Sequence, residues 1–317
     1  MQPAPIDPQM QAVLTKNKET VPDPLDVCTA PIDAVRKQYM AGRAFWNEVG
    51  PDLPSVKDYQ VSAPAGPLTV RLYRPGTDGQ SLPVLLYCHG GGFVYGNLDS
   101  HDNICRQIAH RSGWAVLAID YHLAPEHKFP TPLEDVHGVI DWLNDEASAL
   151  GLDQTRVAMG GDSAGASITV GVAVELRDTR PDYLKKMILI YGNHGLGADC
   201  QSVKLYGGEA YGLSDRTRAF YRGSYYGDPE VNAADPRNAH LSADLTGLPP
   251  AFLGAAELDP LRDNSPAMAE ALSAAGIAAR CKIYPGMMHG FLHYTRYCDQ
   301  SNAAHDDIAA ALNADQI

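Results

Sequence analysis

The sequence lacks several features that would assign it to a specialised class of protein. Its 317 residues include no run of about 18 apolar residues that could span a bilayer, and no basic N-terminal segment followed by an apolar core. They include no CxxC pair and no Asn-x-Ser/Thr sequon. We therefore expect a cytoplasmic protein without integral membrane contact, whose six scattered cysteines stay reduced.

Positive charge is also scarce. The chain has 25 Lys and Arg against 38 Asp and Glu, which gives a formal net charge of −13. A surface this acidic repels phosphate backbones, so nucleic acid is not an expected partner. A dinucleotide enzyme is disfavoured as well, because no G-x-G-x-x-G follows the first buried strand.

Strand and helix signals alternate over most of the chain. Two alternating segments near 56–62 and 68–75 are typical of antiparallel strands. Short apolar runs typical of buried parallel strands follow at 83–88, 114–120, 156–161, 187–191, 251–256 and 282–286. Helical segments lie between or after them, at about 99–111, 132–149, 164–178, 263–275 and 302–313. This order predicts an α/β fold with a mostly parallel, doubly wound sheet of about eight strands.

Two regions break this alternation. Residues 1–50 are rich in proline and then helical from about 32 to 49, which indicates an arm or cap beside the main domain at 51–317. A long Gly- and Tyr-rich insert, with a predicted helix at 215–225, separates the buried strands at 187–191 and 251–256. Insertions at the carboxyl end of a parallel strand usually cover or shape a site.

A G-x-S-x-G motif places a serine at a sharp turn. Gly161-Asp162-Ser163-Ala164-Gly165 follows a predicted strand and opens an apolar helix. The glycines relieve crowding at such a turn, and the serine is left exposed at the helix N-terminus, where the helix dipole favours developing negative charge. The strand before it and the helix after it favour a nucleophile over a simple glycine–serine turn.

Three consecutive glycines follow the strand at 83–88, in His89-Gly90-Gly91-Gly92-Phe93. Their backbone N–H groups are not shielded by side chains. Ester hydrolysis needs such donors to hold a tetrahedral oxyanion, and one donor contributes about 10²–10³ in rate. Upstream of a G-x-S-x-G motif, this segment is a candidate oxyanion loop.

A serine nucleophile needs a base and an acid, expected in the order serine, acid, histidine. Among the downstream histidines, His289 lies just past a strand, where a loop would carry it over the sheet edge. The loop after 251–256 offers Glu257, Asp259 and Asp263, of which Asp259 is the favoured acid. We expect Asp263 to cap the next helix or lie in its first turn, and Glu257 to be a solvated strand end or a supporting residue.

From these motifs the chain resembles the hormone-sensitive lipase family of α/β-hydrolases, the bacterial group IV esterases. The resemblance covers about residue 56 to the C-terminus. It rests on HGGGF at 89–93, YHLAPEHKFP at 121–130, GDSAG at 161–165, DPLRD at 259–263 and HGF at 289–291. It implies the α/β-hydrolase fold with a helical cap, built from the arm at 1–50 and an insert at about 192–235.

The resemblance also implies roles for individual residues. Ser163 would be the nucleophile, His289 its base and Asp259 the acid that orients the base. The backbone N–H groups of three residues would form the oxyanion hole: Gly91, Gly92 and Ala164. Two further residues near the site would be structural and not catalytic: His89 and Asp162.

The expected activity is therefore the hydrolysis of short-chain carboxylic esters through an acyl-enzyme intermediate, with no cofactor and no metal. An amidase or deacetylase on the same triad is an alternative, and so is a non-catalytic small-ligand receptor of the same fold, against which His289 argues. The expected partner is a small-molecule ester. The sequence leaves open whether a second copy of the chain binds as a homodimer.

Overall fold

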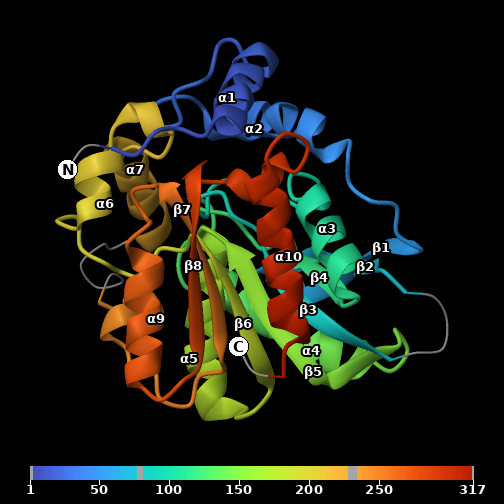
Figure 1. Cartoon of the computed structure of the whole chain (residues 1–317). Coiled ribbons are helices and arrows are strands. Elements are labelled where there is room, and N and C mark those ends of the chain that lie inside the picture. Colours follow the sequence, from blue (N-terminus) through green and yellow to red (C-terminus); the bar gives the residue numbers. More distant parts are fainter. Residues whose placement is uncertain (1–2, 77–80, 228–233, 316–317) are drawn as a thin grey trace.

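The computed structural model describes residues 3–76, 81–227 and 234–315. An eight-stranded sheet forms its centre (Figure 1), in the order β1-β2-β4-β3-β5-β6-β7-β8. β1 and β2 pair antiparallel, β2 pairs antiparallel with β4, and all other pairs are parallel. The strands are β1 (Ser55–Ala63), β2 (Gly66–Arg74), β3 (Leu82–Cys88), β4 (Ala115–Ile119), β5 (Leu152–Asp162), β6 (Leu184–Ile190), β7 (Ala251–Leu258) and β8 (Ala279–Met288).

Helices cover both faces of this sheet. The helices are α1 (Pro8–Thr20), α2 (Ile32–Asn47), α3 (Asp102–Ser112), α4 (Thr131–Glu146), α5 (Ala164–Thr179), α6 (Gln201–Tyr206), α7 (Asp215–Tyr226), α9 (Asn264–Ala274) and α10 (Asp299–Asn313). One core cluster joins α4, α5 and α9 to the sheet, and a second joins α3 and α10 to its other face. This layering confirms the predicted α/β fold.

The central strands are apolar throughout because both of their faces are covered. In β3 every residue is buried, and the side chains alternate between the two clusters. Val84 and Leu86 belong to the cluster with α4 and α5, whereas Leu85 and Tyr87 belong to the cluster with α3 and α10. Two-sided burial of this kind explains why continuous apolar runs marked the strands in the sequence.

The arm and the insert lie at one end of the molecule (Figure 1). α1 and α2, in blue, lie near the yellow helices α6 and α7 of the insert that connects β6 to β7. The described residues also form three 3₁₀ turns: η1 (Glu209–Tyr211), η2 (His240–Ser242) and η3 (Phe291–Tyr294). We call α1, α2 and the segment between β6 and β7 the cap region.

α1 and α6 were not predicted from the sequence, and other element boundaries differ from the predicted ones by a few residues. α1 was read as a proline-rich arm, yet Pro8 occupies its first turn, where proline is tolerated because its missing N–H would have no partner. The Asp7 side chain caps the helix by accepting from Gln9 N at 2.7 Å. The helix expected from 99 begins at Asp102, and the strand expected at 282–286 extends over Ala279–Met288.

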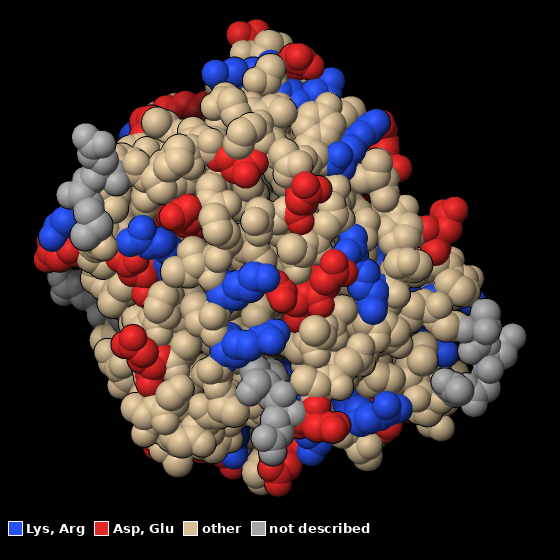
Figure 2. Space-filling view, viewed as in Figure 1, with Lys and Arg blue, Asp and Glu red and all other residues tan. Residues whose placement is uncertain are grey.

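The surface mixes charges of both signs. On the face shown in Figure 2, acidic and basic side chains are interspersed over a largely uncharged surface. Lys282 with Asp307 and Arg111 with Asp306 are examples of such pairs, at 2.6 Å each. Among the described helices, none combines the length and apolar character needed to cross a bilayer.

Candidate active site

Ser163 lies in the turn between β5 and α5. Its backbone has φ 54° and ψ −116°, a conformation that costs a non-glycine residue about 1–3 kcal/mol. The turn brings the start of α5 against the end of β3. A Cβ on Gly165 would lie 1.9 Å from the carbonyl oxygen of Cys88, so only glycine fits there. The strained turn holds the serine side chain away from the sheet at a helix N-terminus.

Three of the candidate residues form one chain of hydrogen bonds. The Ser163 Oγ lies 2.8 Å from His289 Nε2, and His289 Nδ1 lies 2.6 Å from an oxygen of Asp259. Asp259 directly follows β7 and His289 directly follows β8, so parallel neighbouring strands deliver both side chains to the same sheet edge. The geometry fits a hydroxyl activated by an imidazole that is itself oriented by a carboxylate.

Asp259 is fixed as well as buried. Its side chain is 0% exposed, whereas that of His289 is 16% exposed. The second carboxylate oxygen accepts from Leu261 N at 2.8 Å, which leaves the first for the imidazole. The ring of Tyr191 lies against His289, 4.8 Å between centroids. The base therefore has one well-defined orientation, with Nε2 directed at Ser163.

Unpaired backbone donors lie beside the serine. In the part of the chain that the structure describes, the N–H groups of Gly91, Gly92 and Ala164 donate to no protein acceptor. Gly91 has φ 125°, and a Cβ on it would lie 1.9 Å from the carbonyl oxygen of Tyr95, so the loop conformation requires glycine. Free N–H groups of this kind can stabilise an oxyanion.

The family comparison identifies the same fold as the structure. A protein family described by its alpha/beta hydrolase fold matches residues 85–293, more than half of the chain. The chain belongs to the hormone-sensitive lipase family of α/β-hydrolases.

Similar proteins of this family are esterases. An acetyl esterase of Salmonella choleraesuis (strain SC-B67) is 36% identical over 292 residues, which cover 91% of this chain and 88% of that protein. The structure of a hyperthermophilic esterase from the archaeon Pyrobaculum calidifontis has a TM-score of 0.90 at 32% identity, covering 97% of this chain and 98% of the other. A thermostable carboxylesterase cloned from a metagenomic library has a TM-score of 0.87 at 34% identity, covering 91% and 98%. The chain is a serine carboxylesterase.

The other two candidate carboxylates, Asp263 after β7 and Glu257 near the end of β7 itself, have different contacts in the esterase. Asp263 occupies the N-cap position of α9, as expected, but its side chain forms no cap hydrogen bond. Its carboxylate accepts instead from Ser202 N at 2.7 Å and from the Arg262 side chain, which connects α9 to α6 of the cap region. Glu257 accepts from Gly286 N at 2.7 Å.

His89 and Asp162 belong to a buried polar network behind the serine. His89 Nδ1 lies 2.8 Å from the carbonyl oxygen of Gly90, and burial lowers the pKa of this histidine to about 3. Asp162 accepts from Tyr87 Oη and from Gly90 N at 2.9 Å each. Burial alone would raise the pKa of Asp162, but these donors and the nearby His101 lower it to about 2. The network holds the start of the oxyanion loop against the serine turn.

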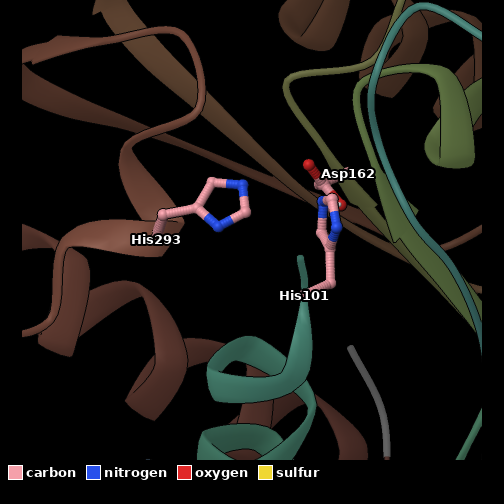
Figure 3. A group of neighbouring side chains, drawn as sticks. All are labelled: His101, Asp162 and His293. Carbon is pink, nitrogen blue, oxygen red and sulfur yellow. Dashed lines mark ion pairs between the residues drawn. The ribbon is translucent and has the colours of Figure 1, made fainter. Parts of the chain in front are cut away.

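One group among the described residues has the composition of a metal site. His101, Asp162 and His293 point toward one another (Figure 3), with ligand atoms within 4.8 Å of one another. The imidazole of His101 already faces Asp162, with Nε2 3.4 Å from a carboxylate oxygen. The arrangement fits a buried polar network better than a metal site.

A cavity of about 640 Å³ opens over the serine and is lined by both the core and the cap region. Most of the residues that line it were not predicted from the sequence, including side chains from the arm and from α7: Asn17, Tyr39, Arg43 and Tyr221. Tyr39 and Arg43 are four residues apart and therefore share one helix face, a signal that was available in the sequence. Which cavity that face lines depends on tertiary packing.

Proposed function

We propose that the esterase hydrolyses short-chain carboxylic esters through a covalent acyl-enzyme formed on Ser163. The observation that carries this proposal is the uninterrupted hydrogen-bond chain from Ser163 through His289 to Asp259, at 2.8 and 2.6 Å. Ser163 and His289 line the same cavity as the glycine loop with its free N–H groups.

In the acylation step, Ser163 Oγ attacks the ester carbonyl carbon while His289 Nε2 takes the hydroxyl proton. Asp259 keeps the proton of the imidazole on Nδ1 and stabilises the imidazolium that forms. The carbonyl oxygen becomes an oxyanion, for which the N–H groups of Gly91, Gly92 and Ala164 are the available donors. Collapse of the tetrahedral intermediate expels the alcohol, which receives its proton from His289.

Deacylation repeats the steps of acylation with water as the nucleophile. His289 removes a proton from water, the hydroxide attacks the acyl carbon, and the same donors hold the second oxyanion. The carboxylate product leaves when Ser163 Oγ recovers its proton from His289. Every proton transfer uses one imidazole, so no metal or organic cofactor is required.

A preference for short acyl chains is supported by the position of Tyr221. A Cβ built on Gly92 would lie 2.5 Å from the Tyr221 ring, so α7 lies directly over the glycine loop. The hydroxyls of Tyr221 and Tyr95 are in contact beside that loop. The name of the Salmonella relatives, acetyl esterase, agrees with a small acyl group.

A series of p-nitrophenyl esters from acetate to decanoate tests this proposal. We expect kcat/KM to be highest for acetate or butyrate and to fall as the chain lengthens. A parallel assay with p-nitroacetanilide, matched to p-nitrophenyl acetate, tests the amidase alternative. A maximum at decanoate would contradict the short-chain preference, and anilide turnover equal to ester turnover would favour the amidase.

A further inference from the structure

Arg43 contributes a positive charge to the wall of the active-site cavity. It lies on α2 of the arm, is partly buried, and lines the same cavity as Ser163 and His289. Its guanidinium stacks on the Tyr39 ring, 4.7 Å from the centroid, and donates to Tyr294 Oη at 3.3 Å. Both partners are tyrosines, and neither contact requires the tyrosine to be ionised.

Another arginine on the same helix has the carboxylate partner that Arg43 lacks. Arg36, seven residues earlier, binds both oxygens of Glu126 at 2.8 and 2.7 Å. In contrast, no ion pair found within residues 3–76, 81–227 and 234–315 includes Arg43. Stacking on a neutral ring offsets only part of the cost of removing a guanidinium from water. Within the described part of the chain, the charge of Arg43 is therefore left without a carboxylate at ion-pair distance.

Tyr39 and His293, which interact with Arg43, do not supply a negative charge. Burial raises the pKa of Tyr39 to about 12, even though Arg43 acts in the opposite direction, so Tyr39 stays neutral at physiological pH. Burial, reinforced by Arg43, holds the pKa of His293 well below its ordinary value, so this imidazole stays neutral as well. The ionised Asp162 also lines the cavity, but among the described residues no carboxylate lies within ion-pair distance of Arg43, so the positive charge at this corner has no direct counterion.

Hydrogen-bond donors gather at this corner. Tyr294 Oη accepts from Arg43 at 3.3 Å and from Asn17 Nδ2 at 3.4 Å. Because its oxygen already accepts two bonds, the hydroxyl proton of Tyr294 is free to donate, and the described residues offer it no acceptor. All three residues line the cavity. A guanidinium with an adjacent hydroxyl donor is suited to binding a carboxylate.

We propose that the esterase is selective for esters that carry a free carboxylate, which Arg43 and Tyr294 bind while Ser163 attacks the ester group. Such substrates are half-esters of dicarboxylic acids or acyl esters of hydroxy acids. The proposal rests on the ester hydrolysis proposed above. Because the whole chain carries a net charge of −13, a preference for an anionic ester has to arise locally.

Matched ester pairs test this selectivity in a pH-stat, which needs no chromophore. The acyl-side arm compares the monomethyl esters of succinate, glutarate and adipate with methyl butanoate, pentanoate and hexanoate. The alcohol-side arm compares acetoxyacetate with ethyl acetate. We expect wild type to have the higher kcat/KM for the anionic member of at least one pair, which also identifies the side that carries the carboxylate.

The variants Arg43→Gln and Arg43→Lys assign the selectivity to this residue. Removing the charge should lower the ratio of anionic to neutral kcat/KM by about 10- to 100-fold, mainly through KM. Lysine should restore part of the ratio. Arg222→Gln is the matched control, because Arg222 also lines the cavity but its side chain is exposed to solvent. The ratio of anionic to neutral kcat/KM in this variant should stay near that of wild type. Equal ratios in wild type and Arg43→Gln, or an equal loss in Arg222→Gln, would overturn the proposal.

A binding measurement separates this inference from the proposed function. Calorimetry of monomethyl succinate, glutarate and adipate with Ser163→Ala should give an affinity that Arg43→Gln weakens about tenfold or more. Arg43-dependent binding in a protein that hydrolyses no ester would support the carboxylate site while contradicting the proposed hydrolysis. Binding that is unaffected by Arg43→Gln would overturn the carboxylate site whatever the activity.

Discussion

The side chains proposed to break the ester bond and those that line the opposite wall of the cavity come from different parts of the molecule. Ser163, Asp259 and His289 each directly follow the last residue of a parallel strand. In the cap region, Tyr39 and Arg43 lie on α2 and Tyr221 lies on α7, so these side chains project from helices and do not follow strands. The sheet thus positions the side chains of the core, whereas helix packing and individual polar contacts, such as that of Arg36 with Glu126, position those of the cap region.

This difference separates two kinds of mutational effect. A change in the core should alter the rate for every ester in the same proportion, because all substrates share one transition-state chemistry. A change in the cap region should alter the relative rates of different esters, because it changes binding of the remote part of the substrate. The predictions below test this division, beginning with the core.

Replacing Ser163 with alanine should have the largest effect, because the nucleophile is lost. We expect turnover of all esters to fall by about 10⁶. A fluorophosphonate probe should label one residue of wild type, which peptide mapping should place at Ser163, and should not label the variant. Labelling that persists in Ser163→Ala would contradict the assignment of the nucleophile.

Asp259→Asn should have the second-largest effect. The amide keeps the shape of the side chain but favours the wrong imidazole tautomer, which costs about 10⁴ in kcat in the serine-protease triad. Asp263→Asn is the matched control in the same loop. Its amide oxygen can still accept from Ser202 N, so most turnover should remain. Steady-state kinetics of both variants would contradict the assignment if Asp263→Asn showed the large loss and Asp259→Asn did not.

Acidification should destabilise the core and the cap region together, because both contain buried neutral histidines. Burial lowers the pKa of His240 in η2 and of His305 in α10 to about 4. Unfolding returns each to about 6.5, so the unfolded chain binds more protons between pH 4 and 6.5. The free energy of unfolding should therefore fall as the pH drops through this window, by up to about 3 kcal/mol per histidine.

Urea denaturation measured from pH 7 to pH 4 checks this prediction. His305→Gln keeps a donor for the carbonyl oxygen of Ser301, which the imidazole Nδ1 contacts at 2.8 Å, but it removes one titrating group. Its stability should depend less steeply on pH than that of wild type. An equally steep dependence in the variant would mean that His305 does not bind a proton on unfolding.

The two regions also differed in how much the sequence could predict. Each core strand was predicted within a few residues of its position, because burial on both faces requires an apolar run and glycine has to occupy the contacts at the serine turn. The spacing of Ser163, Asp259 and His289 after strands was readable for the same reason. Such constraints are local, so they leave a pattern in a short stretch of sequence.

The cap region was predicted less well because its constraints are tertiary. α1 was missed although Asp7 and Pro8 form a recognisable helix start, since neighbouring prolines at 3 and 5 suggested an irregular arm. Arg43 was missed because its significance is the absence of a carboxylate partner, which depends on how α2 packs against the core. A carboxylate that pairs with an arginine can come from any part of the chain, so sequence spacing does not reveal whether Arg43 has one.

The contact between the two halves of the cap region should have the smallest effect. Arg216 on α7 binds both oxygens of Asp26 in the arm, at 3.0 and 2.7 Å, and this exposed pair lowers the pKa of Asp26 to about 2. Solvent and salt screen such a pair, so Asp26→Asn should change KM for p-nitrophenyl butyrate at most a few-fold and leave Ser163 labelling intact. The small change should disappear at high salt, where the wild-type pair is screened as well. A loss of turnover comparable to that of Asp259→Asn would show that the cap region controls the chemistry itself and would contradict the division between the two regions.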